Sequence, residues 1–218
     1  MEVITLRIPN HIGIIPDGNR RFALSKGLNK EDGYKYGLKP GLELLKSCKN
    51  LSIKELTFYG FTVDNTKRPK IQKESFTKAC IAAAHILSKE DAELLVVGNT
   101  SSKCFPKELL PYTNLTKFGN GGIRVNFLVN YGWQWDLSLL KGSCFNDKDI
   151  PSSVHSSEIS RIDLIIRWGG RCRLSGFLPV QSVYSDFYII NDNWPEYNEN
   201  HLLEALNWYD TQDITLGG

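Results

Sequence analysis

Short apolar runs of β-forming residues recur along the whole chain, and stretches of helical character separate them. Several runs are nearly continuous in apolar residues, which is typical of parallel strands covered on both faces. The candidate strands are residues 12–15, 56–61, 94–97, 123–129 and 162–166, with a weaker sixth at 187–190, and the candidate helices are 38–49, 73–90 and 201–209. This alternation predicts an α/β fold with an open, mostly parallel, six-stranded sheet flanked by helices.

The composition fits one globular domain over residues 1–218 and excludes several classes of protein. Hydrophobic residues make up 41% and charged residues 23%, so the chain is neither disordered nor fibrous. The net charge of +2 indicates no general affinity for nucleic acid. Any anion site must therefore come from a local cluster of cations.

The cysteines and the N-terminus indicate a cytoplasmic protein. Five cysteines occur without a Cys-x-x-Cys pair, and the four histidines have no zinc-ligand spacing. An odd number of cysteines at low density favours a reducing compartment. The first residues carry an early acid and no long apolar segment, so we expect neither a signal peptide nor a membrane span.

Arginine is combined with small or amide residues in three segments that directly follow predicted strands. These segments are residues 16–23, 62–69 and 167–177. In an open α/β sheet, ligands bind beyond the carboxyl ends of the strands, so these segments are the candidate sites. Neither G-x-x-x-x-G-K-[ST] nor G-x-G-x-x-G is present, so a nucleotide hydrolase or a dinucleotide enzyme is not favoured.

The first segment has the residues of an anion-binding turn. Gly18 permits a tight turn, and Asn19 can cap a helix. Arg20 and Arg21 can form charge-assisted hydrogen bonds to an anion. An acid beside an anion site makes sense mainly as a metal ligand, which gives Asp17 a candidate role. The alternative is an ordinary strand-to-helix turn with solvated arginines.

The third segment has two glycines followed by Arg171, Arg173 and Ser175. Guanidinium groups match phosphate oxygens in shape and charge, and a serine hydroxyl can donate a further hydrogen bond. The segment could therefore fold around a second diphosphate. The alternative is a basic surface loop without a ligand.

The second helix candidate is crowded with small and apolar residues. Phe76 and Ile86 lie about three turns apart on it, and Ala79, Ala83 and Ala84 lie between them. The ordinary interpretation is a helix packed closely on the sheet. The functional interpretation is one wall of a shallow channel for a hydrocarbon chain, in which the alanines leave the space.

In order and content, these segments resemble the cis-prenyltransferases, the Z-isoprenyl diphosphate synthases. The first segment matches the family pattern H-x-A-x-I-M-D-G-N-x-R-W-A, and further blocks follow in the family's order over nearly the whole chain. The matching positions are residues 11–23, 56–61, 65, 68–69, 130–132, 135–136, 163–167, 173–177, 181, 184 and 194–195. So many ordered blocks argue against coincidence.

The resemblance implies an enzyme that joins an allylic prenyl diphosphate to isopentenyl diphosphate, with Mg²⁺ as its cofactor. It gives Asp17 and Asn65 roles in catalysis, and it gives Asp17 and Asp186 roles in Mg²⁺ binding. The implied diphosphate-binding residues are Gly18, Asn19, Arg20, Arg21 and Lys30 for the allylic substrate, and Arg68, Arg167, Arg173 and Ser175 for isopentenyl diphosphate. The resemblance also implies a homodimer, a hydrophobic substrate tunnel and peripheral membrane contact for product release.

Several positions depart from the family pattern. Arg171 stands where the family has a glutamate, Thr66 replaces a tryptophan, and Lys30 replaces an arginine. Tyr34 replaces a histidine, and the C-terminal Arg-x-Gly reads Thr-Leu-Gly at residues 215–217. These departures, together with the short chain, indicate a divergent member.

Only 28 residues separate Pro69 from Gly98, and a strand occupies the last of them, so the helix after Pro69 is brief. A brief helix predicts a shallow channel and therefore short- to medium-chain products.

Other functions stay open. One is irregular, head-to-middle coupling of the lavandulyl type, since residues of the second diphosphate site are altered. Another is a non-catalytic subunit of a heteromeric synthase, although such subunits tend to lose the aspartate loop and keep the C-terminal motif, the opposite of the pattern here. A simple phosphate-binding module is less favoured, because two separate arginine segments suit two diphosphates.

Overall fold

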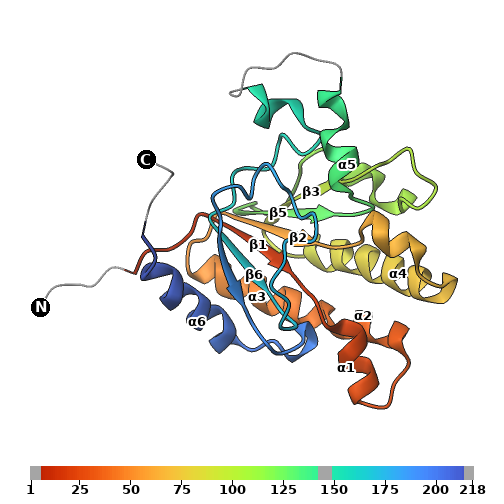
Figure 1. Ribbon diagram of the computed structural model, residues 1–218, viewed down its shortest axis with the longest axis horizontal. Helices are drawn as coiled ribbons and strands as arrows, with labels where there is room; N and C mark the ends of the chain where they lie inside the picture. The colour runs from red at the N-terminus through yellow and green to blue at the C-terminus, as the bar shows by residue number, and fades with distance from the viewer. Residues whose placement is uncertain (1–5, 142–148, 214–218) are drawn as a thin grey trace, which may run out of the picture.

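The computed structural model describes residues 6–141 and 149–213, and Figure 1 shows a twisted sheet with helices packed against it. Within these residues, seven strands form one sheet in the order β4-β3-β5-β2-β1-β6-β7. All neighbouring strands are parallel except β3 and β4. The strands are β1 (His11–Ile15), β2 (Glu55–Tyr59), β3 (Ala92–Val97), β4 (Thr116–Phe118), β5 (Ile123–Leu128), β6 (Leu164–Arg167) and β7 (Asp186–Ile189).

All six predicted strands are present, which confirms the mostly parallel α/β sheet. The additional strand, β4, pairs antiparallel with β3 at one edge, where Thr116 lies opposite Leu94. The sequence pattern does not predict β4, because three residues are too few to show an alternation of apolar and polar side chains.

Helices and short 3₁₀ turns connect the strands. The α-helices of the described residues are α1 (Asn19–Ser25), α2 (Gly33–Tyr36), α3 (Leu38–Asn50), α4 (Lys70–Leu87), α5 (Trp133–Asp136) and α6 (Glu199–Asp210). The three predicted helices are α3, α4 and α6. Helix α4 begins at Lys70 rather than residue 73, because Pro69 is its N-cap and a proline is tolerated there. None of the helices in these ranges is both long and apolar enough to cross a membrane.

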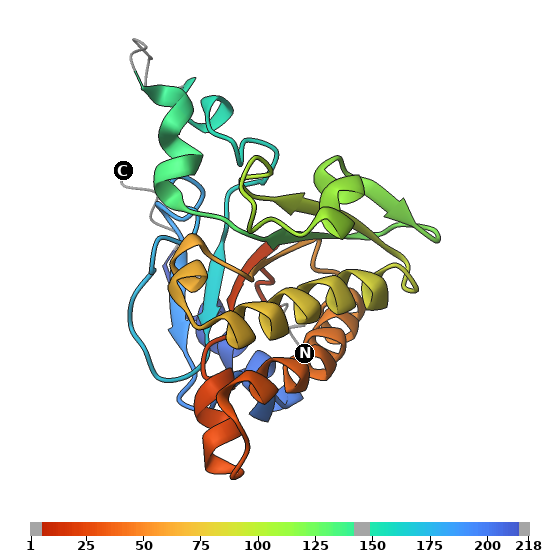
Figure 2. The ribbon, with the colours of Figure 1, turned by 90° about the vertical axis from the view of Figure 1, so that its right-hand side faces the viewer.

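Alternate residues of the strands enter two separate cores. Ile12 and Ile14 of β1 are fully buried in the larger core, which also contains buried side chains of α3, α4 and α6. Ile165 of β6 belongs to the smaller core on the opposite face, where Phe177 and Leu178 cover it. Figure 2 shows α3 and α4 side by side on the face of the larger core. Both faces of the central strands are therefore buried, as their nearly continuous apolar runs predict.

The carboxyl ends of β2, β1 and β6 meet at one end of the sheet. The parallel register places Ile14 beside Phe58 and Ile15 beside Arg167. The three arginine-containing segments follow these strands, so the fold brings them together although up to 150 residues separate them along the chain.

Candidate active site

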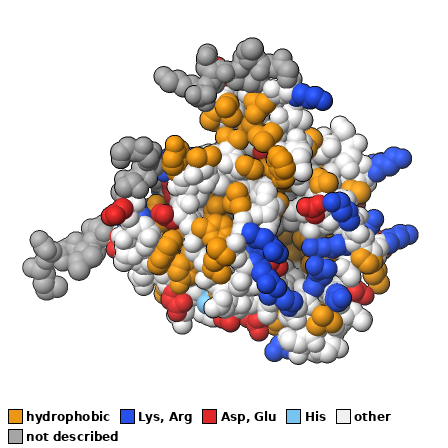
Figure 3. All heavy atoms as spheres, in the orientation of Figure 1, with side chains coloured by type: hydrophobic (Ala, Val, Ile, Leu, Met, Phe, Trp, Pro, Cys, Tyr) orange, Lys and Arg blue, Asp and Glu red, His pale blue; other side chains and the backbone are white. Residues whose placement is uncertain are grey.

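A polar pocket of about 620 Å³ lies beyond the carboxyl ends of β1, β2 and β6. Figure 3 shows lysine and arginine side chains gathered on this part of the surface, to the right of centre. Nearly all of the predicted site residues line the pocket: Asp17, Gly18, Asn19, Arg20, Arg21, Lys30, Asn65, Arg68, Arg167, Arg173 and Ser175. Arg171, one of the departures from the family pattern, lines it as well.

Arg167 joins the first and third segments at the centre of the pocket. It is the last residue of β6, only 3% exposed, and its Nη2 donates to Asp17 Oδ2 at 2.8 Å. Its Nη1 donates to Ser175 Oγ at 2.9 Å and to the carbonyl of Arg173. The guanidinium therefore holds both segments in a fixed geometry while staying at the wall of the pocket.

The carboxyl group of Asp17 is held in its ionised form. Burial by itself would raise the Asp17 pKa, but the hydrogen bond and positive charge of Arg167 oppose burial. The Gly18 amide, which donates to Asp17 Oδ1 at 2.6 Å, and the charge of Arg21 act in the same direction as Arg167. Together these groups lower the Asp17 pKa below its usual value, so a negative charge faces the pocket at neutral pH.

Two glycines allow close packing around the first segment. Gly18 has a φ of 101°, and a Cβ at this position would overlap the side chain of Asn193. Gly169 has a φ of 84°, and a Cβ there would overlap the guanidinium of Arg21. Both positions need glycine because of the positive φ and because of the close approach. Arg21 consequently lies over the third segment, with Nη2 3.7 Å from Asp17 Oδ1.

The second segment contributes a short 3₁₀ turn, η2 (Val63–Lys67), to the pocket wall. Thr62 and Asn65 form a reciprocal cap, in which the Thr62 amide donates to Asn65 Oδ1 at 3.1 Å and the Asn65 amide donates to Thr62 Oγ1 at 3.3 Å. Arg68 follows the turn and donates from Nη1 to the hydroxyl of Tyr34 at 2.9 Å. The cap fixes the direction in which Asn65 and Arg68 enter the pocket.

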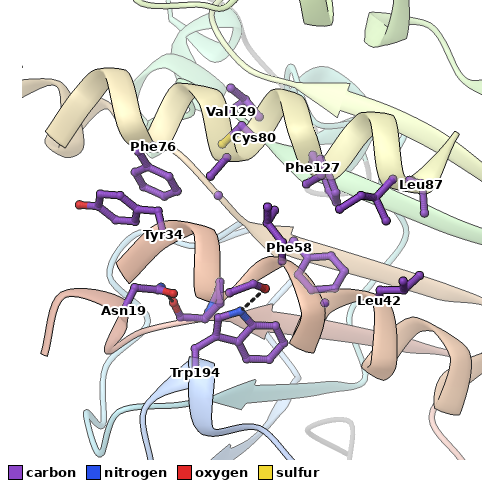
Figure 4. A pocket seen from close by; sticks show the side chains of 18 of the residues that line it. Asn19, Tyr34, Leu42, Phe58, Phe76, Cys80, Leu87, Phe127, Val129 and Trp194 are labelled. Atoms are coloured by element: carbon purple, nitrogen blue, oxygen red, sulfur yellow. Dashed lines mark hydrogen bonds between the residues drawn. The ribbon is translucent and has the colours of Figure 1, made fainter. Parts of the chain in front are cut away.

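An apolar cavity of about 130 Å³ adjoins the polar pocket and lies between α3, α4 and the sheet (Figure 4). The side of α4 predicted as a channel wall lines it with Phe76, Ala79, Ala83 and Ile86. Ala84 does not line the cavity; it is 1% exposed and packs in the larger core. The polar pocket and the cavity share five lining residues, which are Pro16, Asn19, Tyr34, Gly60 and Phe76.

The structure does not bring Asp186 to Asp17. Asp186 begins β7 and pairs in register with Leu164, at the amino end of β6, whereas Asp17 contacts Arg167 at the opposite end of that strand. Three residues of strand separate these ends by about 10 Å. Asp186 instead faces Arg7, with an O–N distance of 3.7 Å. Within the single chain, Asp186 therefore lies outside the pocket and away from Asp17, and its role in Mg²⁺ binding stays a prediction.

Tyr59 and Tyr34 line the pocket, although the sequence predicts no role for either of them in the site. Tyr59 ends β2 and donates from its hydroxyl to the carbonyl of Ser175 at 2.8 Å. Tyr34 is noted there only as a replaced histidine, and its contact with Arg68 spans 34 residues of sequence. Tyr59 could have been predicted, because it is the last residue of a strand whose carboxyl end lies at the site. No local sequence pattern predicts the contact between Tyr34 and Arg68.

An open parallel sheet, with a cation-rich pocket that adjoins an apolar cavity at its carboxyl end, defines an α/β protein suited to molecules with an anionic head and a hydrocarbon tail. Residues 15–217 match the model of a family described as "Putative undecaprenyl diphosphate synthase". The chain therefore belongs to this family, the cis-prenyltransferases, and is a transferase of prenyl groups.

Individual relatives agree with this assignment. The chain is 30% identical over 229 residues to a ditrans,polycis-undecaprenyl-diphosphate synthase ((2E,6E)-farnesyl-diphosphate specific) of Vibrio parahaemolyticus, covering 96% of this chain and 91% of that protein. It is also 30% identical over 233 residues to an isoprenyl transferase of Clostridium tetani, covering 97% and 90%.

A solved structure shares the fold. Lavandulyl diphosphate synthase from Lavandula x intermedia, in complex with dimethylallyl diphosphate, matches with a TM-score of 0.84 and 22% sequence identity. The match covers 96% of this chain and 98% of that chain. At this sequence identity the likeness shows the fold alone.

Proposed function

We propose that this protein condenses an allylic prenyl diphosphate with isopentenyl diphosphate and releases a short- to medium-chain Z-prenyl diphosphate. One observation carries the proposal: an arginine-rich pocket and an apolar cavity meet at five shared residues. A diphosphate in the pocket and its hydrocarbon tail in the cavity would account for both. Two relatives are named undecaprenyl diphosphate synthase and isoprenyl transferase, and these names support the same chemistry.

The two diphosphates would occupy different sides of the pocket. The allylic diphosphate would bind the turn at Gly18 and Asn19, with Arg20, Arg21 and Lys30 around it. Isopentenyl diphosphate would bind Arg68, Arg167, Arg173 and Ser175. The two sets of residues come from different parts of the chain. The residues for the allylic diphosphate belong to the start of α1 and to η1 (Lys30–Asp32), and three of the four for isopentenyl diphosphate belong to β6 and the segment after it.

The reaction needs charge stabilisation rather than a nucleophilic side chain. The C–O bond of the allylic diphosphate breaks, and its electron pair leaves with the diphosphate. The double bond of isopentenyl diphosphate supplies the pair for the new C–C bond, and a proton then passes to a phosphate oxygen. Arg20 and Arg21 would stabilise the leaving diphosphate, because their positive charges lie at the pocket where negative charge develops on it.

Asp17 fits a role in holding Mg²⁺ together with a diphosphate. This ion is commonly bound by one or two carboxylates plus substrate phosphates and water. Asp17 has a lowered pKa and a side chain 35% exposed to the pocket. Within residues 6–141 and 149–213, no cluster of three or more His, Cys, Asp or Glu side chains could hold a metal without substrate. When bound, Mg²⁺ would add positive charge at the leaving group.

The homodimer, the cytoplasmic location and the contact with a membrane at product release follow from the family resemblance and the cysteine pattern. We retain them as proposals. Gel filtration with light scattering tests the dimer, and sedimentation with lipid vesicles tests the membrane contact.

Product analysis tests the proposed function. Purified protein is incubated with Mg²⁺, isopentenyl diphosphate and allylic diphosphates of increasing length, and the dephosphorylated products are identified by mass spectrometry. We expect chains extended by a few Z units. Failure of every starter to react, in protein that is folded, would contradict the proposal.

Irregular coupling is the second candidate function. Arg171 lines the pocket where the family has a glutamate, so the acceptor site has an additional cation. Such a site could accept a second allylic diphosphate instead of isopentenyl diphosphate. Incubation with dimethylallyl diphosphate alone separates the two functions, since only irregular coupling yields a ten-carbon product.

A further inference from the structure

Two stacked aromatic rings form the neck between the polar pocket and the apolar cavity. The ring centroids of Tyr34 and Phe76 are 4.5 Å apart, and their planes differ by 2°. Figure 4 shows the pair at one end of the cavity, with Tyr34 from α2 and Phe76 from α4. Both residues line the pocket and the cavity. A hydrocarbon tail that extends from the pocket into the cavity therefore has to pass these rings.

Arg68 holds the pair closed from the side of the polar pocket. Its Nη1 donates to the Tyr34 hydroxyl at 2.9 Å, and its guanidinium carbon lies 5.9 Å from the centroid of the Phe76 ring. A hydrogen bond from a cation is stronger than one between neutral groups, and the cation is also attracted to the face of the ring. Phe61, which is buried, packs edge to face on Phe76 with centroids 5.3 Å apart.

The backbone that carries Tyr34 has little room to move. A Cβ at Gly33 would overlap the carbonyl group of Asn19, so α2 lies directly against α1. On its other side, Trp194 Nε1 donates to the carbonyl of Gly37 at 2.9 Å. Tyr34 can therefore open the neck mainly by turning its side chain, which breaks the contact with Arg68.

The size of the cavity limits what can lie beyond the neck. Its volume is about 130 Å³. An apolar protein cavity of about 150 Å³ holds one benzene molecule, so this cavity holds about one isoprene unit. With the diphosphate in the polar pocket and the first isoprene unit in the neck, the second unit fills the cavity.

We propose that the Tyr34–Phe76 pair, held by Arg68, restricts the allylic substrate to a tail of about ten carbons. The starters of this class are dimethylallyl and geranyl diphosphate. A third isoprene unit, as in farnesyl diphosphate, exceeds the volume of about 130 Å³, so it fits only when a ring of the neck is displaced. This inference rests on the proposed function and adds the substrate class to it. It also narrows the expected product to the short end of the proposed range, because a tail that has grown to about fifteen carbons no longer binds as an allylic substrate.

Binding without turnover tests the restriction. The probes are the thiolodiphosphate analogues of dimethylallyl, geranyl and farnesyl diphosphate, in which sulfur replaces the bridging oxygen, and inorganic pyrophosphate. Calorimetry at constant Mg²⁺ gives the four dissociation constants. In the wild-type protein, we expect the geranyl analogue to bind at least about tenfold more tightly than the farnesyl analogue, a difference of about 1.4 kcal/mol.

Two substitutions act on the pair in different ways. Phe76→Ala widens the neck, so the farnesyl analogue should bind within about threefold of the geranyl analogue, with the affinity for pyrophosphate unchanged. Tyr34→Phe keeps the ring but removes the contact with Arg68, and it should reduce the farnesyl disadvantage about threefold. The matched controls are Ile71→Ala and Tyr36→Phe, which change exposed residues of the same helices that line neither cavity. Both controls should keep the wild-type ratio.

Equal affinity of the wild-type protein for the geranyl and farnesyl analogues would overturn the restriction. An unchanged ratio in folded Phe76→Ala would overturn the role of the pair, and Phe76→Leu provides the same test if the alanine variant does not fold. Loss of binding for all four probes, pyrophosphate included, is a different result, because it contradicts the proposed function itself.

Discussion

The polar pocket and the apolar cavity meet at one neck, but their walls are held in place in different ways. In the pocket, Arg167 has individual partners in Asp17 and Ser175, and the loss of one partner leaves a buried charge without its hydrogen bond. In the cavity, Ala79 and Ala83 are positioned only because α4 packs on the sheet. A single substitution in the polar wall should therefore cause a large loss of activity. A substitution in the apolar wall should instead change the shape of the cavity by a small amount.

The largest effect is expected for Asp17→Ala. It removes the ionised carboxylate that we propose holds Mg²⁺, so turnover should fall roughly 100- to 1000-fold. It also leaves Arg167 without its carboxylate, which should lower the free energy of unfolding by about 1–2 kcal/mol, since solvent weakens the pair at the 35%-exposed aspartate. Steady-state kinetics and denaturant unfolding measure the two effects. Asp17→Asn is the control for size, and most of the wild-type rate in Asp17→Ala would contradict the assignment.

The second prediction separates the two diphosphates. Arg173 is exposed at the pocket, so Arg173→Ala should leave folding intact and remove a charge-assisted hydrogen bond to isopentenyl diphosphate. The KM for this substrate should rise roughly 10- to 150-fold, while the KM for the allylic substrate changes little. Arg161→Ala is a control at an exposed arginine that does not line the pocket. Equal changes in both KM values would mean that the third segment does not distinguish the substrates.

The apolar wall should respond in product size rather than in rate. Ala83→Leu adds side-chain volume to a cavity of about 130 Å³, so the product distribution should shift to shorter chains. The first condensation should keep most of its rate, because the diphosphates bind elsewhere. Ala84→Ser, at a buried position of α4 outside the cavity, is the control for changes in packing. An unchanged product distribution in folded Ala83→Leu would exclude this face of α4 as the wall.

The smallest predicted effect is on stability in acid. The Asp17 pKa is lowered in the folded protein, so its contribution to stability is present above the unfolded-state pKa of about 3.9 and is lost as the pH falls through the folded-state value. The difference in unfolding free energy between wild type and Asp17→Asn should therefore shrink below about pH 4. Urea unfolding from pH 3 to pH 7 measures it. A constant difference over this range would show that Arg167 does not shift the carboxylate.

The pattern of apolar residues predicts the sheet well because buried parallel strands leave a strong signal. Residues 94–97 and 162–166 are nearly continuous apolar runs, and the structure has β3 and β6 there. Strand β4 leaves no such signal, since Lys117 is exposed and its neighbours are only partly buried. It exists because its backbone pairs with β3, and sequence patterns do not report pairing between distant segments.

The pocket is predictable to the extent that its residues lie directly after strands. Asp17 and Arg173 follow β1 and β6, and the parallel register brings both to one end of the sheet. Asp186, which only the family resemblance indicates, opens β7 rather than following it and lies at the other end of the sheet. Tyr34 shows the limit of this reasoning: its role depends on stacking with Phe76, which only the packing of α2 on α4 creates.

The contact between Gly169 and Arg21 has a consequence for how this protein can diverge. Arg21 occupies the space that any other side chain at position 169 would need, and Arg167 of the third segment binds Asp17 of the first. The effect of a mutation in residues 16–23 therefore depends on which residues are present at 167–177, and the reverse also holds. We expect the two segments to coevolve. A chimera that grafts residues 16–23 from a relative should regain activity only when residues 167–177 come from the same parent.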